Sequence, residues 1–289
     1  MCSESPGTTV TSAGPAKILI GGQGFSPPDW VGSFYPPGFP AARFLPFYAQ
    51  VFDTVELNTT FYAIPSASTI CAWRERVPDH FVFSAKMPRA VTHDKQLLDI
   101  EADVNSFIER IKVLGDKLGA IVIQFPASFT RRHQDRLSAF LPLLPHDLRF
   151  AIEFRSSTWD HPDVFDLLRQ ANVAWCTTHW QDLPPVVQIT ADFAYFRLVG
   201  FHDEFSRLDR VQHDRSQELA FWARTVSELS GRLSRIYLYV NNHYEGHSPA
   251  TLNRLKRLLG VQRIDPQDLW PEHQRQLPGM PATREPLRS

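Results

Sequence analysis

Short apolar runs recur along the chain, and longer stretches of more polar sequence separate them. Near-continuous apolar runs of this length are typical of parallel strands that are covered on both faces. We predict eight such strands, at Lys17–Gly22, Phe52–Asn58, Phe81–Lys86, Ala120–Phe125, Arg149–Phe154, Val173–Thr178, Ala194–Val199 and Ile236–Asn241.

The segments between most of these runs carry apolar residues at helical spacing. One predicted helix begins at His161-Pro162, because proline suits the first turn. Another ends near Gly231, a residue type that commonly terminates helices. The residues that mark the predicted helices are Leu97, Ile100, Val104, Phe107, Ile111, Leu114 and Leu118; Phe165, Leu167 and Leu168; Leu219, Trp222, Val226 and Leu229; and Leu252, Leu255 and Leu258.

Eight strands alternating with helices in about 245 residues predict an α/β fold, a TIM (β/α)8 barrel. We expect a single barrel domain over residues 16–260. The connection Gln181–Asp192 contains Pro184-Pro185 and no helical pattern, so we expect an irregular crossover between the sixth and seventh strands. Residues 1–15 are predicted to be a flexible arm, and residues 261–289 a tail that packs on the barrel or trails from it.

A doubly wound open sheet that binds a dinucleotide is the rival fold. It would require a glycine-rich phosphate turn after the first strand, and Gly21-Gly22-Gln23-Gly24 faintly resembles one. Pro27-Pro28 follows, however, where a helix with free amide donors should begin. The sequence therefore favours the barrel.

Polar groups follow the predicted strands where each strand ends. Glu56 and Asn58 are two residues apart in a strand-like segment, so their side chains share one face. In a barrel, the carboxyl ends of the strands line one mouth, where active sites lie. The strand-end residues that we expect at this mouth are Glu56, Asn58, Lys86, Gln124, Glu153, Arg155, Arg197 and Asn241.

These residue types indicate anion binding combined with acid–base chemistry. Lys86, Arg155 and Arg197 would hold a phosphate or carboxylate, with each arginine gripping two oxygens. Glu56 and Glu153 would act as base and acid if their surroundings split their pKa values. His93, seven residues beyond Lys86, would lie in a loop over the mouth and carry protons near neutral pH.

The remaining candidates would orient the substrate. Asn58, Gln124 and Asn241 offer amide hydrogen bonds. Tyr62 and Trp159 are the aromatic candidates for stacking on a ring-bearing substrate. Each residue also has a plainer interpretation: a solvent-exposed carboxylate, an ion pair between Glu153 and Arg155, a loop-capping histidine, or aromatic rings that pack loops onto the barrel.

Composition narrows the classes of partner. The formal net charge is −1, which argues against a long nucleic-acid footprint, although a local basic cleft stays open. Three scattered cysteines indicate a reduced cytoplasmic setting, and no apolar run of about 18 residues predicts a membrane span. The chain has no His-Glu-x-x-His motif for zinc, but a divalent cation such as Mg²⁺ or Mn²⁺ shared with a phosphate remains open.

The ordered motifs resemble the YecE-like family, domain-of-unknown-function family seventy-two, whose known structures are TIM barrels. The resemblance spans roughly residues 17–260, and it implies the fold without implying a reaction. The matching blocks are Ile20-Gly21 to Asp29-Trp30 and Tyr35-Pro36; Phe52 to Asn58 with Phe61-Tyr62 and Pro65; Trp73 and Pro78; Phe81 to Lys86; Thr92-His93; Gln124-Phe125-Pro126; Glu153-Phe154-Arg155 with Trp159; Tyr195-Phe196-Arg197 with Gly200; and Tyr239 to His243.

The chain departs from the family pattern at two places. Gln23-Gly24-Phe25 and Pro27-Pro28 stand where the family usually has Ser-Gly-Trp followed by Tyr, and Val199 stands where the family often has His. These departures indicate altered contacts near the first and seventh strands.

Three functional hypotheses follow. The first is an enzyme of hydrolase or lyase type that acts on a small anionic or phosphorylated molecule. The second is a metal-dependent phosphodiesterase or nucleic-acid-binding protein with a divalent ion at Glu56 and Glu153. The third is a non-catalytic ligand-binding barrel, in which both glutamates would be locked in ion pairs with Arg155 and Lys86. The sequence does not indicate an oligomeric state.

Overall fold

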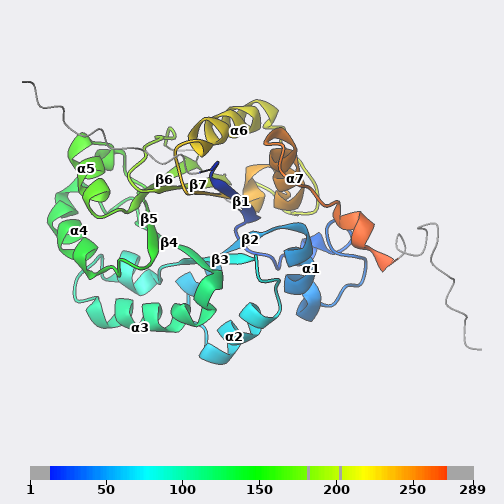
Figure 1. Ribbon diagram of the computed structural model, residues 1–289, viewed down its shortest axis with the longest axis horizontal. Helices are drawn as coiled ribbons and strands as arrows, with labels where there is room; N and C mark the ends of the chain where they lie inside the picture. The colour runs from blue at the N-terminus through cyan, green and yellow to red at the C-terminus, as the bar shows by residue number, and fades with distance from the viewer. Residues whose placement is uncertain (1–13, 181–182, 202–203, 272–289) are drawn as a thin grey trace, which may run out of the picture.

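Eight parallel strands close into a barrel in the computed structural model, which describes residues 14–180, 183–201 and 204–271 (Figure 1). The strand order follows the chain, and β1 pairs with both β2 and β8. The predicted TIM barrel is therefore confirmed, and every predicted strand end lies within two residues of the observed one. The strands are β1 (Lys17–Gly22), β2 (Thr54–Leu57), β3 (Val82–Lys86), β4 (Leu118–Gln124), β5 (Arg149–Glu153), β6 (Ala174–Trp180), β7 (Phe193–Gly200) and β8 (Arg235–Val240).

Helices surround the barrel (Figure 1). The prediction for α5 is confirmed, because Pro162 opens the helix and the His161 side chain accepts a hydrogen bond from the Asp163 amide. The predictions for α6, which ends against Gly231, and for α7 are confirmed as well. The helices are α1 (Phe44–Val51), α2 (Ala67–Glu75), α3 (Glu101–Ile111), α4 (Gln134–Phe140), α5 (Pro162–Gln170), α6 (Ser216–Ser230) and α7 (Ser248–Leu258).

The helix predicted from Leu97 to Leu118 is shorter than its apolar pattern. Leu97 has a positive φ of 67°, which an α-helix does not accommodate. After α3, residues Lys112–Lys117 form a 3₁₀ segment in which Gly115 has φ 59°, and Leu118 already belongs to β4. The apolar spacing continued beyond the helix because the flanking segments pack against the same core.

The connection between β6 and β7 is irregular, as predicted. From Leu183 to Asp192 the described chain forms no helix, and residues 181–182 lie outside the described residues. Thr190 binds this segment to the preceding strand: its hydroxyl accepts a hydrogen bond from the Trp175 amide at 2.7 Å and donates one to the Val173 carbonyl at 2.6 Å.

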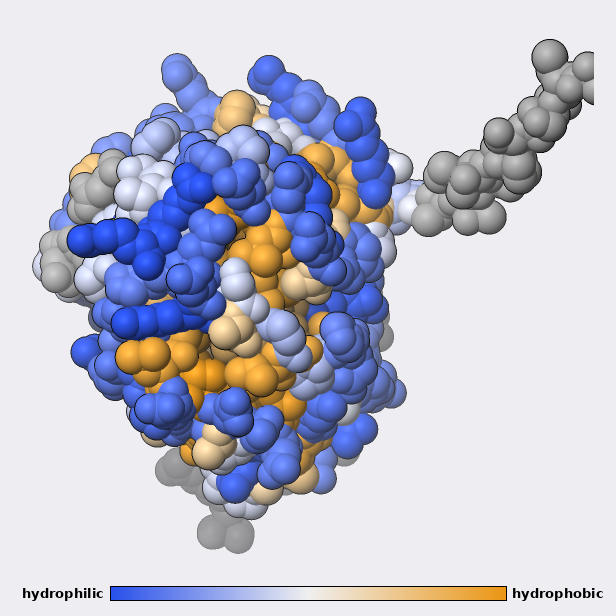
Figure 2. All heavy atoms as spheres, turned by 90° about the vertical axis from the view of Figure 1, so that its left-hand side faces the viewer, coloured by the Kyte–Doolittle hydropathy of each residue, from blue (hydrophilic) through white to orange (hydrophobic). Residues whose placement is uncertain are grey.

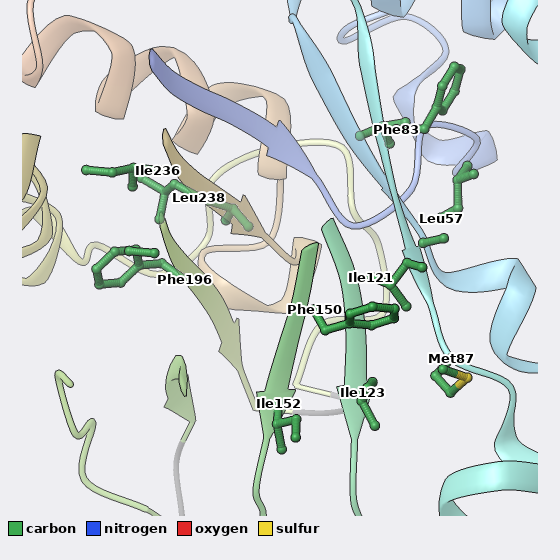
Figure 3. Close-up of a cluster of buried hydrophobic side chains, with 14 of the residues drawn as sticks. Leu57, Phe83, Met87, Ile121, Ile123, Phe150, Ile152, Phe196, Ile236 and Leu238 are labelled. Carbon is green, nitrogen blue, oxygen red and sulfur yellow. The ribbon is translucent and has the colours of Figure 1, made fainter. Parts of the chain in front are cut away.

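Side chains on the two faces of each strand form separate cores. The outward faces share one cluster with the buried faces of the helices. Figure 3 shows part of it, with Ile121 and Ile123 of β4 near Phe150 and Ile152 of β5. The inward faces fill the barrel with a second cluster: Leu19, Val82, Ala120, Val122, Ala151, Ala174, Cys176, Phe193, Tyr195, Tyr237 and Tyr239. The alternation follows from the two-residue period of a strand.

The barrel interior contains hydroxyl groups among its apolar residues. The Tyr239 hydroxyl lies 2.7 Å from that of Thr54 and donates to the Ser84 hydroxyl at 2.8 Å. The Tyr195 hydroxyl donates to a carboxylate oxygen of Glu56 at 2.7 Å. Buried polar groups are stable where they find such partners. These bonds lead from the barrel interior to the charged layer above it.

The outer surface is mostly hydrophilic, but apolar residues gather on the side of α4 and α5 (Figure 2). There a groove of about 450 Å³ is lined by residues that include Leu141, Leu144 and Leu167. In the described C-terminal part, the Trp270 indole donates a hydrogen bond to the Phe34 carbonyl at 3.3 Å; residues 1–13 and 272–289 lie outside the described residues. None of the described helices combines the length and the apolar character that a bilayer crossing requires.

Candidate functional site

A cavity of about 470 Å³ opens at the carboxyl ends of the strands. Eight of the eleven residues predicted for the site line it: Asn58, Tyr62, Lys86, His93, Gln124, Arg155, Arg197 and Asn241. Glu56, Glu153 and Trp159 do not line it. The lining contains four cationic side chains, Lys86, Arg89, Arg155 and Arg197, and no carboxylate among the described residues.

Arg197 forms the floor of the cavity and has no free donor. Its Nε and Nη2 donate to the two carboxylate oxygens of Glu56, at 3.0 and 2.7 Å. Its Nη1 donates to Glu153 and, at 3.5 Å, to Gln124, while Nη2 also donates to Gln23 at 3.3 Å. A guanidinium has five N–H donors, so this set occupies all of them. Arg197 therefore has no pair of free N–H donors with which to bind a substrate, contrary to our expectation.

The two glutamates lie beneath the cavity. Both are fully buried, at 0% exposure, and each is paired with Arg197. Burial alone would raise the pKa of Glu153, but the charges of Arg155 and Arg197 outweigh burial and lower the pKa to about 2. Glu153 is therefore ionised at neutral pH, and the expected role of an acid with a raised pKa does not fit it. The third hypothesis placed both glutamates in ion pairs, but the partner of Glu56 is Arg197 and not Lys86.

Arg155 faces the cavity from the loop after β5. Its Nε lies 2.6 Å from Glu153, and its guanidinium lies over the Trp180 ring at 4.3 Å. Within the described residues, no hydrogen bond holds its two terminal nitrogens. The side chain is only 9% exposed, so these nitrogens are held in place between a carboxylate and an aromatic ring. They are available to an oxygen anion in the cavity.

Lys86 ends β3 at the edge of the cavity. Its ammonium lies 3.9 Å from the centre of the Phe61 ring, and no described carboxylate lies within ion-pair distance of it. The pKa of Lys86 is lowered from 10.5 to about 8, mainly by burial; the charge of Arg197 lowers it as well, whereas the charges of Glu153 and Glu56 raise it. Lys86 is therefore charged at neutral pH but holds its proton weakly.

His93 reaches the cavity from a π-helical segment, Ala90–Asp94. Segments of this kind are rare and often occur at functional sites. Burial and the charges of Lys86 and Arg89 lower the pKa of His93 to about 4. The imidazole is thus neutral at pH 7, which corrects the expectation that it exchanges protons near neutrality. Its Nδ1 lies 2.8 Å from the Thr92 hydroxyl.

Amide side chains complete the wall of the cavity. The Gln23 side-chain oxygen accepts from Asn241 at 3.0 Å and from Arg197, which leaves the Gln23 amide nitrogen buried without a partner in the described structure. The side-chain oxygen of Asn58 is likewise buried and unpartnered there. Asn58 lies just past β2, in a 3₁₀ turn, and not in the strand as predicted. Two residues that line the cavity therefore each carry a buried polar atom without a described partner, one a donor and one an acceptor.

The two aromatic candidates lie in different surroundings. Tyr62 is 80% exposed at the rim, against the Phe61 ring. Trp159 is fully buried: its indole donates to the Phe129 carbonyl at 2.6 Å, and its ring stacks on Phe129 and Phe154. Trp159 packs a loop onto the barrel, so its predicted contact with substrate does not fit the structure.

Seven of the fifteen lining residues were not among the predicted site residues: Gln23, Phe61, Arg89, Pro126, Ala127, Trp180 and Val199. Gln23 follows Gly21 by two positions, so the strand period would have placed it at the mouth beside the other strand-end residues. Trp180 ends β6 and lies at the mouth for the same reason. Arg89 carried no such signal, because it precedes a π-helical turn that the apolar pattern does not reveal.

The expected divalent-cation site does not fit the structure. The two glutamates that would supply its ligands are engaged by Arg197, and Glu153 by Arg155 as well. Guanidinium groups within ion-pair distance of these carboxylates would repel a metal ion bound to the same oxygens. The described residues contain no group of three or more His, Cys, Asp or Glu side chains arranged to hold a metal.

The known proteins that share sequence with this chain include two UPF0759 proteins. The UPF0759 protein YecE of Escherichia coli (strain K12) is 35% identical over 118 residues, which are 41% of this chain and 42% of YecE. The chain thus spans less than half the length of that relative. The UPF0759 protein YunF of Bacillus subtilis (strain 168) is 24% identical over 277 residues, which are 85% of this chain and 95% of YunF.

Similar solved structures include two DUF72 family proteins. A DUF72 family protein from Thermotoga maritima MSB8 has a TM-score of 0.73 at 30% identity, over 84% of this chain and 99% of that one. A DUF72 family protein from Enterococcus faecalis V583 has a TM-score of 0.69 at 21% identity, over 86% of this chain and 99% of that one, which shows the shared fold. The model of the family described as "Protein of unknown function DUF72" matches residues 19–275. The chain therefore belongs to the DUF72 family, in agreement with its resemblance to YecE-like proteins.

Proposed function

We propose that this protein is an enzyme that binds a small anionic substrate in the barrel mouth, with Arg155 and Lys86 as the groups that hold the anion. One observation carries the proposal. The cavity lining has four cations and no described carboxylate, and the ammonium of Lys86 and the terminal nitrogens of Arg155 have no described hydrogen-bond partner. The buried ammonium of Lys86 has no described partner, which is costly, and an anionic ligand would supply one; the same anion would accept from the terminal nitrogens of Arg155, whose Nε is already paired with Glu153.

Arg155 is the group that would orient the anion. A guanidinium binds a carboxylate or phosphate through two parallel hydrogen bonds. Glu153 and the Trp180 ring already fix the plane of this guanidinium, so little side-chain entropy is lost on binding. The free amide nitrogen of Gln23 and the free oxygen of Asn58 would then select a substrate that offers both an acceptor and a donor.

The acid–base role that the sequence assigned to the glutamates passes to Lys86 in this proposal. Glu56 and Glu153 act through Arg197, which they hold in place as a fixed positive charge under the cavity. Lys86, with its pKa of about 8, can accept or release a proton near neutral pH. His93 stays neutral and can donate or accept one hydrogen bond.

A non-catalytic ligand-binding barrel is the second candidate. The observation that favours it is that both glutamates lie in ion pairs, which removes the two groups that barrel enzymes often use for proton transfer. The two candidates share the anion site. They differ in whether Lys86 takes part in bond making.

Calorimetric titration with lactate and with inorganic phosphate tests the anion site. The wild-type protein should bind at one site, and Arg155→Met should weaken binding about tenfold or more, because a charge-assisted hydrogen bond contributes about 1.5–3 kcal/mol. Arg169→Met is the matched control. Its guanidinium pairs with Asp166 on α5, and Arg169 does not line the cavity.

The result that would overturn the proposal is equal affinity in the wild type and Arg155→Met, or no saturable binding of either anion by the wild type. A melting curve of each variant shows that it is folded. Arg155→Lys keeps the positive charge but loses the two parallel N–H donors of the guanidinium. Its affinity for the anion should lie between those of the wild type and Arg155→Met.

A further inference from the structure

Lys86 differs from the other buried lysines of the chain. Lys117 donates to the carbonyls of Arg74 and Val77, both at 2.9 Å, and Lys256 donates to the Val51 carbonyl at 3.2 Å. These two amines are tied to the backbone. The amine of Lys86 has no hydrogen bond or ion pair among the described residues, although the residue is only 9% exposed.

The surroundings of Lys86 fix its position and lower its pKa. The Thr60 hydroxyl donates to the Lys86 carbonyl at 2.7 Å and accepts from the Lys86 amide at 3.0 Å, so the end of β3 is held firmly. The ammonium lies over the Phe61 ring, and Phe61 is itself buried. Desolvation and neighbouring cations are the two conditions that turn a lysine into a nucleophile at neutral pH. Lys86 meets both, because burial and Arg197 lower its pKa.

We propose that Lys86 is a nucleophile that forms an imine with the carbonyl carbon of an anionic aldehyde or ketone bound in the barrel mouth. This inference rests on the proposed anion site and adds the substrate class: a carbonyl compound that also carries a carboxylate or phosphate. The anion would lie on Arg155, and the carbonyl carbon would lie at the Lys86 amine. Both groups line one cavity, so a small molecule can reach both.

The step balances without a cofactor. The Lys86 ammonium first releases a proton to solvent, and its amine attacks the carbonyl carbon. A C–N bond forms as the second C–O bond breaks, and the nitrogen passes a proton to the oxygen, which becomes a hydroxyl; the proton released at the start returns when this hydroxyl leaves. The nitrogen then forms a second bond to the carbon, and the hydroxyl leaves with one proton as water. The product is a protonated imine. No electron donor or acceptor is consumed, and the positive charge of the ammonium is retained on the imine nitrogen.

The surrounding groups suit this chemistry. Protonated imines withdraw electrons, so they activate the neighbouring C–H or C–C bond for cleavage. Arg197 beneath the cavity keeps a second positive charge near the amine, which favours the neutral form of Lys86 before attack. Glu56 and Glu153 oppose this effect because they raise the pKa of Lys86, and their two negative charges are balanced by Arg155 and Arg197 together.

Reductive trapping tests the inference. The wild-type protein is incubated with pyruvate and sodium borohydride, and the modified peptide is located by mass spectrometry. We expect one carboxyethyl group on Lys86, with little on the exposed Lys95 and Lys112, which lie in ion pairs with Asp103 and Asp147. Lys86→Arg should abolish the modification, whereas Lys112→Arg should leave it unchanged. Lactate, which has no carbonyl group, should protect Lys86 when present in excess.

The outcomes separate this inference from the proposed function. Saturable binding of pyruvate by the wild type without trapping at Lys86 overturns the imine and leaves the anion site standing. Trapping of neutral acetaldehyde at Lys86 as readily as pyruvate confirms the nucleophile and overturns the anion site. Modification spread evenly over Lys86, Lys95 and Lys112 overturns the imine, because it shows no special reactivity.

Discussion

Arg197 is the residue on which the charged layer of this barrel depends. It joins Glu56 and Glu153, which approach from strands on different sides of the barrel, and the Tyr195 hydroxyl supports Glu56 from below. Buried charges are tolerated only when they are paired and hydrogen-bonded. The layer meets this condition and leaves Arg155 and Lys86 as the cations that face a ligand.

Replacing Arg197 by methionine should destabilise the protein strongly. The substitution leaves Glu56 buried without its arginine partner, and breaking a buried pair in this way costs about 3–5 kcal/mol. Urea unfolding at neutral pH measures the loss of free energy. The exposed pair of Arg169 and Asp166 provides the control, since Arg169→Met should change stability by no more than about 0.5 kcal/mol. Similar midpoints for the two variants would contradict the buried-pair interpretation.

At the scale of elements, the backbones of β1 and β2 lie so close together at Gly21 that no side chain would fit there. They pair at only two positions, Gly21 with Thr54 and Gly22 with Val55. The Tyr48 hydroxyl bridges the two strands, accepting from the Gly22 amide at 2.7 Å and donating to the Thr54 carbonyl at 3.1 Å. A glycine in a strand often marks such a close approach of two backbones. The closure of the barrel at this seam therefore requires Gly21.

Gly21→Ala should weaken this closure. A Cβ at Gly21 would overlap the carbonyl oxygen of Thr54, and that backbone atom cannot move aside as a flexible side chain would. Overpacking of this kind costs roughly 1–3 kcal/mol. Gly231→Ala is the matched control, because Gly231 has φ −76° and open space around its Cβ, so the change should be neutral or slightly stabilising. The midpoints of urea unfolding measure the stability of the two variants. Equal midpoints would refute the steric argument.

The elements themselves were largely predictable from the sequence. Strands and most helices followed from apolar runs and helical spacing, because a barrel repeats the same burial pattern eight times. The helix before β4 was predicted too long. Leu97 and Leu118 keep the helical spacing but belong to a left-handed turn and to a strand, and only backbone geometry distinguishes these cases.

The depth of a residue within the barrel was not predictable. The sequence placed Glu56 and Asn58 on one strand face, but Asn58 lies in the 3₁₀ turn after β2, and two positions along a strand already differ by roughly 7 Å in height. Asn58 therefore reaches the cavity, whereas Glu56 lies below it. The height of the cavity floor depends on where Arg197 from β7 crosses the barrel, and that register depends on all eight strands. The burial of Trp159 by Phe129 likewise depends on a contact between separate connections.

The whole molecule separates its charges between the cavity and the rest of the chain. The formal net charge is −1, yet the described cavity lining carries only cationic charged groups. Glu56 and Glu153 offset the charges of Arg155 and Arg197, and Asp94 pairs with Arg89, so Lys86 is the lining cation without a described carboxylate partner. A positive charge between low-dielectric walls sets up a field that attracts anions. Because part of this field comes from Lys86, whose pKa is about 8, the attraction for anions should depend on pH.

The affinity for lactate should fall as the pH rises through about 8. Below this pH Lys86 is an ammonium that pairs with the anion, and above it the amine is neutral, because burial has lowered its pKa from 10.5. Loss of one charge-assisted contact should weaken binding about tenfold between pH 7 and roughly pH 9.5. Lactate does not titrate in this range and forms no imine, so calorimetry reports Lys86 alone. Lys86→Met should bind more weakly and without this pH dependence, Lys112→Met should behave as wild type, and a flat wild-type profile would show that Lys86 does not contact the anion.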